Sequence, residues 1–497
     1  MKSVAGHLIR ALLICATAAQ AAETATTEPV SGDVLLLDNL GRPVPTPIES
    51  LPPGLRPKTP TDLEHQIPPP QKGSPAPEAV RQKLDTMRES APPYEWFPAI
   101  PPALMPYLYN QDEFGNTVAR PGPLLDIFPL DPVVQGAKTW TSRRGLRYSL
   151  SQTFTYSGMS DVMRGDDELG NYNLDVLAKW AVFDARGAGG TAGWISTQIE
   201  YQAALGGGES NQSVKANTGA LTNPLVFHSN HASWRVPELA WQQSFDAGRV
   251  VALAGIVNQQ NYLDANSYAN TGRGQFMNSA LVNSMVLPLP AYNYGLNLQW
   301  QPSHDWYGMV GYSVGNANAG ETPDTNFSWQ AWSLEWELGW TPDNVLGLGG
   351  GIYRIQPFVA RSEGPVQGGL SFNFEQKLGR NSPLAWFGRF GGGGSQVSGG
   401  AKAQVGTGFV MQAPLMHLGL VPRLSNDLAG VGFVWSQPSA TTKTVYHENE
   451  YVFETFYTLH LSPASIVQPD LQVIWNPAFN PDPGPAVVFQ FQFILKW

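Results

Sequence analysis

The clearest evidence for the fold is in residues 486–497, AVVFQFQFILKW. Every second residue from Val487 onward is apolar or aromatic, whereas the alternate positions include Gln490, Gln492 and Lys496. A β-strand shows this alternation when its two faces meet different surroundings. The apolar face of this strand therefore lies against a protein core or against lipid, and the strand ends on the aromatic Trp497.

A soluble sandwich would bury the apolar face, whereas a transmembrane barrel turns it toward lipid and its polar face toward the lumen. No later stretch approaches the roughly 18 apolar residues of a membrane helix. The composition, with 14% charged and 11% aromatic residues, agrees with a barrel because half of each barrel strand is polar. We therefore predict an all-β fold, a transmembrane antiparallel β-barrel surrounded by outer-membrane lipid.

Residues 1–21 have the pattern of a secretory signal peptide. Lys2 and Arg10 accompany a short apolar core, and Ala19-Gln20-Ala21 fits a small-x-small cleavage site. The single cysteine lies inside this segment, so we expect a mature protein without disulfides. An exported barrel of this kind is expected in the outer membrane of a Gram-negative cell.

Residues 22–140 hold over half of the 42 prolines. Proline cannot donate ladder hydrogen bonds and favours extended chain, so we predict a mostly irregular periplasmic extension. One short helix is expected over 77–91, where a proline precedes good helix formers. A tether, a docking segment for a periplasmic partner and a plug of the pore all stay open as roles. Residues 141–497 are predicted to form the barrel.

From residue 146 onward, strand candidates alternate with Gly, Asn, Asp and Pro. Sixteen are found, an even number, as expected for a bacterial single-chain barrel. The candidates are 146–157, 170–182, 191–203, 235–247, 249–259, 291–301, 305–314, 330–341, 345–354, 367–378, 384–393, 400–410, 429–436, 449–462, 469–475 and 486–497.

The alternation is clear in 331–340, where tryptophan and leucine alternate with polar residues that include Glu335 and Glu337. Burial of these carboxylates in a dry core would be costly unless each were paired. A water-filled lumen removes that cost, which favours the barrel over a sandwich.

The lengths of the connections give an independent test. With a periplasmic N-terminus, links after even-numbered strands are short, and 341–344 and 379–382 are predicted as tight turns. Links after odd-numbered strands are longer, including 204–234 and 260–290, with 355–366 of intermediate length. One even link, 411–428, is too long for a simple turn, which suggests an error in a strand boundary there. The asymmetry is otherwise typical of an outer-membrane barrel.

Several blocks resemble the carbohydrate-selective porins of the OprB type. They include residues 237–243 (PELAWQQ), 275–279 (QFMNS) and 468–472 (QPDLQ), of which the last is the most specific. The resemblance covers about 144–497 and does not reach the Pro-rich segment.

The resemblance implies a passive channel for mono- and small oligosaccharides, with a constriction built by inward-folded loops. A sugar-selective pore needs aromatic faces beside charged or amide partners, and its binding must stay weak enough for release. Arg235 and Glu238 rank first, because opposite charges beside a long loop set a field across the pore. The predicted residues of the substrate path are Arg235, Glu238, Asn258, Tyr262, Asp264, Arg273 and Asn278.

Other functions find little support in the sequence. The net charge of −10 argues against a nucleic-acid partner. No cofactor, metal site or catalytic residue is predicted, because His228 and His231 lack further ligands and no nucleophile–base arrangement is found. An envelope assembly or docking barrel and a polysaccharide-export channel, both using the Pro-rich arm, stay open. So does a homotrimer, since lipid-facing and subunit-facing strand residues look alike.

Overall fold

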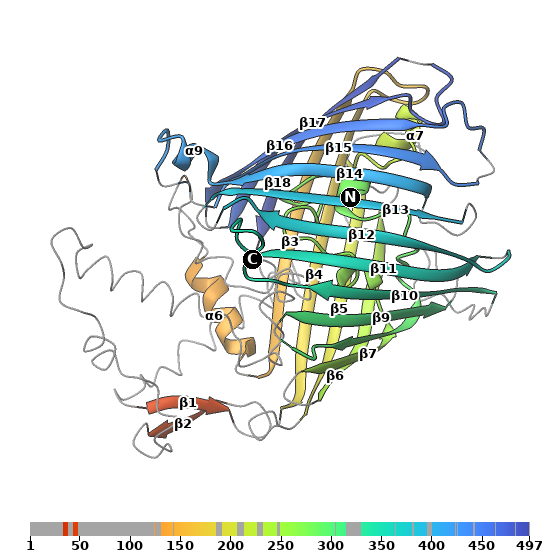
Figure 1. The fold of residues 1–497 in the computed structure, drawn as a ribbon. Coiled ribbons are helices and arrows are strands. Elements are labelled where there is room, and N and C mark those ends of the chain that lie inside the picture. The colour runs from red at the N-terminus through yellow and green to blue at the C-terminus, as the bar shows by residue number, and fades with distance from the viewer. Residues whose placement is uncertain are drawn as a thin grey trace.

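The computed structural model describes residues 33–37, 43–47, 124, 131–142, 144–184, 191–205, 213–225, 232–245, 249–303, 305–314, 330–362, 364–379, 382–394, 400–422, 424, 426–440, 443–462, 464–482 and 484–496. Strands β3 to β18 form a closed antiparallel barrel of 16 strands (Figure 1). Each strand pairs with its neighbours in the chain, and β18 pairs with β3 to close the ring. The predicted barrel and its strand number are confirmed.

The strands of the barrel have the following bounds: β3 Leu146–Met159, β4 Glu168–Asp184, β5 Ala192–Leu205, β6 Ser233–Phe245, β7 Val250–Ile256, β8 Tyr294–Trp300, β9 Trp306–Val314, β10 Ala331–Trp340, β11 Gly351–Ser362, β12 Gln367–Lys377, β13 Leu384–Gly393, β14 Ala401–Gln412, β15 Leu428–Pro438, β16 Glu450–Ser462, β17 Ser465–Trp475 and β18 Ala486–Lys496. Short helices lie in the connections: α7 Val214–Thr218, η4 Gln259–Asn261, α8 Ser279–Val282 and α9 Pro414–His417.

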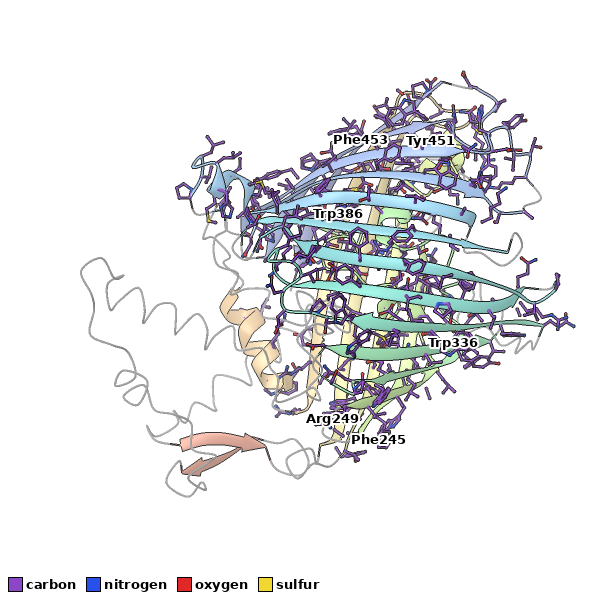
Figure 2. All side chains as sticks on the ribbon, viewed as in Figure 1. Phe245, Arg249, Trp336, Trp386, Tyr451 and Phe453 are labelled. Atoms are coloured by element: carbon purple, nitrogen blue, oxygen red, sulfur yellow. The ribbon has the colours of Figure 1, made fainter. Side chains whose placement is uncertain are left out.

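Strand β10 shows how the sequence pattern produces the two faces of the wall. Trp336 and Leu338 point outward and are 36% and 49% exposed, whereas Glu335 and Glu337 point into the lumen and are 1% and 2% exposed. Figure 2 shows Trp336 and Trp386 on the outer surface of the barrel. Aromatic and aliphatic side chains on this surface suit lipid, because a hydrocarbon environment provides no partner for a polar group.

The predicted position of the ninth barrel strand was wrong. Strand β11 is Gly351–Ser362, shifted from the predicted 345–354, so the link before it is ten residues long and the link after it is short. Residues 346, 347 and 349 have positive φ values of 52°, 82° and 97°, which a strand does not accommodate. This turn, and Pro357 within the true strand, concealed the boundary.

Prolines inside strands coincide with interruptions of the ladder. Pro357 pairs with Leu370 of β12, while the pairing of β11 with β10 skips from Phe358 to Ile355. Pro469 likewise lies where the β16–β17 pairing skips, and β17 begins at Ser465 rather than at the predicted 469. Proline lacks the N–H that one side of the ladder requires, which explains both gaps.

The predicted difference between the two ends of the barrel holds only in part, because the links 341–350 and 413–427 after even-numbered strands are long and the link between β11 and β12 is short. Figure 1 shows α7 and α9 at opposite ends. Helix α7 belongs to a long link after an odd-numbered strand, and α9 lies in the 413–427 link after an even-numbered one. The neighbouring strand boundaries moved by only two residues or fewer, so the length of that link is genuine and the suspected boundary error was wrong.

Before the barrel lie three elements that were not predicted. Strands β1 Asp33–Leu37 and β2 Pro43–Pro47 form an antiparallel pair within the Pro-rich segment, and helix α6 Asp131–Ser142 precedes β3. The predicted signal peptide, 1–21, and the predicted helix, 77–91, lie outside the described residues. Within the described part of the chain, no helix has the length and apolar character needed to span a membrane.

Candidate functional site

The link between β7 and β8, residues 257–293, folds into the lumen. Its backbone and side chains bond to lumen-facing side chains of β4, β5, β6, of β9 to β14, and of β16 and β17. The two ends of this inward loop are held together, because the Val257 amide donates to the Asn293 carbonyl at 3.1 Å and the Gln259 amide to the Pro290 carbonyl at 3.2 Å. The loop therefore crosses the lumen as a closed structure.

One anchor of the inward loop is an ion pair with the wall. The Asp264 carboxylate lies 3.0 Å from Arg389 Nε of β13 and accepts a 2.7 Å hydrogen bond from Asn373 of β12. The Asp264 amide donates to Glu337 of β10 at 2.9 Å. Asp264 is 0% exposed, and charges so deeply buried are stable only when they are paired and hydrogen-bonded.

A second anchor joins loop amides to a carboxylate of β16. The amides of Met277 and Asn278 donate to the two Glu454 oxygens at 2.5 and 3.1 Å. The Asn278 side chain donates to Gln472 of β17 at 3.0 Å and also caps α8 by accepting from the Ala280 amide. The chain turns at α8 because Asn278 satisfies donors that a helix start leaves open.

The third anchor is apolar. Phe276 contacts Phe387 and Phe456, with ring centroids 5.2 and 4.7 Å apart. A Cβ atom placed at Gly432 would lie 2.8 Å from Leu281 and 3.0 Å from Phe276, so glycine at this position makes the room that the loop occupies. The three contacts are called the loop anchors below: Asp264 with Arg389, residues 277–278 with Glu454, and Phe276 with Leu281 over Gly432.

A second inward segment, 213–225, contains α7. The amides of Leu221 and Thr222 donate to the Glu450 carboxylate of β16 at 2.6 and 2.8 Å. Gln472 donates to the Pro224 carbonyl at 2.9 Å. The two long connections that we expected to form the constriction, 204–234 and 260–290, therefore both enter the lumen in their described parts.

On the opposite side, β5 and β6 meet the start of the inward loop. Glu238 of β6 accepts hydrogen bonds from the Tyr262 hydroxyl at 2.8 Å to each oxygen, from Asn261 at 3.4 Å, and from Ser196. Gln198 of β5 accepts from Asn258 at 3.4 Å and from Asn261 at 3.0 Å. A carboxylate, amides and a phenol are thereby brought to one patch of wall.

Charged residues extend this patch along β4 to β6. Arg273 of the loop lies 2.6 Å from the Asp175 carboxylate of β4 and also donates to Asn173. Glu200 of β5 lies in the field of both Arg273 and Arg235. Arg235 is only half-buried, and its Nε donates to Ser233 at 3.2 Å. We call this patch the β4–β6 cluster; it comprises Asp175, Gln198, Glu200, Arg235, Glu238, Asn258, Asn261, Tyr262 and Arg273.

A β-bulge places the two leading candidates on the same face. Arg235 and Glu238 are three residues apart, so a regular strand would turn them to opposite faces. The register of β5 with β6 shifts between Gln198–Glu238 and Glu200–Arg235, so the bulged strand carries one extra residue. Pro237 lies in this bulge, where a missing N–H is tolerated.

The structure brings five of the seven predicted residues together: Arg235, Glu238, Asn258, Tyr262 and Arg273 belong to the β4–β6 cluster. Asp264 and Asn278 lie instead in the loop anchors, against β12–β13 and β16–β17. Of the four further residues of the cluster, Asp175, Gln198 and Glu200 were not predicted, whereas Asn261 belongs to the long connection 260–290 that was expected to form the constriction. The first three are polar residues on the lumen side of strands with an alternating pattern. That pattern marks every lumen-facing residue equally, so it could not single these three out.

The surroundings of Glu337 differ from the water-filled interior inferred from the sequence of β10. Glu337 is satisfied by the loop and the wall: Tyr307 and Gln356 donate to it at 2.7 Å each, and Arg354 lies 3.7 Å away. The inward loop therefore takes the place that the sequence suggested for water at this carboxylate. Among the described residues, no group of three or more His, Cys, Asp or Glu side chains is arranged to hold a metal ion.

A closed barrel with an apolar outer surface, a polar lumen and an inward loop is typical of an outer-membrane channel. Residues 178–368 and 360–495 match the model of the carbohydrate-selective porin, OprB family. The chain belongs to this family, which together with the fold implies location in the outer membrane.

Individual relatives agree with this class. The chain is 28% identical to Porin AaxA of Chlamydia abortus over 46% of its own length and 50% of that protein. It is 24% identical to Porin AaxA of Chlamydia felis over 64% of its length and 69% of that protein. The structure of Pseudomonas putida OprB at high pH shares the fold, with a TM-score of 0.58 and 15% identity over 73% of this chain and 97% of that one.

Proposed function

We propose that the protein is a carbohydrate-selective diffusion channel for mono- and small oligosaccharides, with the β4–β6 cluster as its selective surface. The observation that carries the proposal is the convergence of charged, amide and phenol groups on one side of the lumen, opposite the anchors that hold the loop. Sugar hydroxyls both donate and accept hydrogen bonds, and such a surface offers acceptors and donors for them. The OprB family match supports the same substrate class.

Within this proposal the seven predicted residues divide by accessibility. Arg235 retains exposed surface and is the group from which a passing sugar would accept hydrogen bonds. Glu238, Asn258, Tyr262 and Arg273 are buried and set the shape and field of the surface. Asp264 and Asn278 act by fixing the loop, because their polar atoms bond to the wall.

The test is liposome swelling with the purified full-length chain. Glucose and maltose are compared with amino acids of similar size. Fast entry of the sugars with slow entry of the amino acids is expected. Equal rates for all solutes would contradict carbohydrate selectivity and leave a general diffusion channel.

A homotrimer and a periplasmic partner for residues 22–140 remain predictions. Chemical cross-linking in native membranes tests the first, and deletion of 22–140 tests the second. A channel should still conduct and pass sugar after the deletion, whereas an assembly or docking function would be lost.

A further inference from the structure

Tyr292, near the end of the inward loop, has an unusual backbone conformation. Its φ is 69°, in the left-handed region that bulky residues rarely adopt. The backbone bonds from Val257 to Asn293 and from Gln259 to Pro290 enclose it on both sides, and Gln260 donates to the Leu289 carbonyl at 3.0 Å. The backbone hydrogen bonds that join the two ends of the loop therefore impose this conformation. Strain of this kind persists where the surrounding structure fixes a side chain in one place.

The side chain of Tyr292 reaches the β4–β6 cluster. Tyr292 directly precedes Asn293, whose carbonyl accepts from the Val257 amide beside Asn258 of the cluster, and its phenol lies in the field of Arg235, Glu200 and Asp175. Burial, and then the charge of Glu200, raise the pKa of the Tyr292 phenol above its ordinary value, so the hydroxyl stays protonated. The residue is nevertheless only half-buried. Tyr262, by contrast, is 2% exposed, and its hydroxyl donates a hydrogen bond to Glu238.

Sugar rings have two kinds of surface. Their hydroxyls need hydrogen-bond partners, and their axial C–H groups form an apolar face that packs against an aromatic ring. Arg235 of the β4–β6 cluster and the neighbouring Tyr292 are both partly exposed, and together they offer these two chemistries. A guanidinium that borders an aromatic ring can bind a hydroxyl of the same sugar whose face covers the ring.

We propose that Tyr292 and Arg235 form a platform for a pyranose ring, with the Tyr292 ring under its C–H face and Arg235 beside its hydroxyls. The inference rests on the proposed function and adds a substrate preference to it. The channel should prefer a closed sugar ring to an open-chain polyol. Glucose and sorbitol make this distinction measurable, because they carry similar hydroxyls and only glucose presents a ring face.

The experiment compares entry of glucose, sorbitol and an amino acid of similar size into liposomes that contain the full-length chain. Tyr292→Asn removes the ring but suits the left-handed backbone, so the loop keeps its path. Tyr292→Phe keeps the ring. Tyr451→Ala, on the outer surface of β16, removes a tyrosine away from the lumen and serves as the control (Figure 2). Open-channel ion conductance is recorded for each variant, because a purely structural role of Tyr292 would change it.

In the wild-type channel, glucose is expected to enter faster than sorbitol, and both faster than the amino acid. Tyr292→Asn should lower the concentration-dependent block of ion current by glucose about fivefold to tenfold, as expected for the loss of one aromatic contact. Sorbitol block and ion conductance should stay near wild type. Tyr292→Phe should retain most of the preference for glucose, and Tyr451→Ala should retain all of it.

The platform would be overturned, and the proposed function would stand, if glucose and sorbitol entered the wild-type channel equally fast and both faster than the amino acid. An unchanged glucose preference in Tyr292→Asn would overturn the platform as well. A large change of ion conductance in Tyr292→Asn would also overturn it, since Tyr292 would then act on the loop. Failure of the wild type to separate sugars from the amino acid would refute the proposed function itself.

Discussion

The β4–β6 cluster and the loop anchors use the same residue types for different purposes. Each contains an arginine beside a carboxylate: Arg273 with Asp175 in the cluster, and Arg389 with Asp264 in the anchors. In the anchors the wall and the loop bond to each other around a fully buried carboxylate, whereas in the cluster Arg235 keeps exposed surface. The anchors therefore fix where the loop runs, whereas the cluster is the surface that we propose for contact with a solute.

The largest expected effect comes from breaking the ion pair of the anchors. Arg389→Leu leaves the buried Asp264 carboxylate without its cation, which should lower the free energy of unfolding by about 3–5 kcal/mol. Denaturant titration of the reconstituted protein measures this, and increased current noise would report the freed loop. Arg361→Leu, which alters an exposed arginine of β11, is the matched control and should change little.

A smaller effect is expected at the amide-binding carboxylate. Glu454→Gln keeps the shape of the side chain but replaces one of the two oxygens that accept from Met277 and Asn278 by an amide nitrogen, which cannot accept. A buried N–H group left without an acceptor costs about 1–3 kcal/mol, so a loss in that range is expected in the same titration. Glu448→Gln, in an exposed link, provides the comparison. A stability equal to that of the wild type would show that a neutral side chain at this position anchors the loop equally well.

The apolar anchor can be tested by filling its space. Gly432→Val places methyl groups where Leu281 and Phe276 pack, and overpacking of this kind costs about 1–3 kcal/mol. Gly308→Val should be neutral, because a Cβ atom there would have its nearest neighbour 3.9 Å away. If both variants unfold alike, the loop does not depend on the space at Gly432.

The smallest effect on stability, but a clear effect on transport, is expected in the β4–β6 cluster. Arg235→Met should change the free energy of unfolding by less than about 1 kcal/mol, because the guanidinium is partly exposed. Sugar entry should slow, and the reversal potential in a salt gradient should shift toward cation selectivity, since one positive charge leaves the lumen. Arg361→Met should leave both unchanged. A large loss of stability in Arg235→Met would contradict the separation of the two regions.

Sequence reasoning identified most residues of the candidate site, but it could not predict which of them hold the loop and which belong to the β4–β6 cluster. Asp264 and Arg273 were both predicted because they are charged and lie in the same long loop. One bonds to the wall of β12–β13 and the other to β4, and this depends on how the loop crosses the lumen. Gln198 and Glu200 were missed because alternation marks every lumen position of a strand equally.

Local sequence patterns were sufficient to predict the barrel. Alternation of period two, turn residues at regular spacing and unequal link lengths predicted a closed sheet of 16 strands, because lipid outside and a polar lumen inside impose that pattern on every strand. The prediction was wrong at β11, where proline and glycine were taken as the end of a strand. A proline can end a strand, but it can also lie inside one and interrupt the hydrogen bonds on one side of it only.

The contents of the lumen could not be predicted without the three-dimensional path of the chain. The ion pair of Asp264 with Arg389 joins residues 125 positions apart, and the amides of 277–278 meet Glu454 from more than 170 positions away. No local pattern encodes such partners, because they depend on barrel closure and on the path of the loop across it. The bulge that turns Arg235 and Glu238 to one face likewise exists only once β5 and β6 have paired.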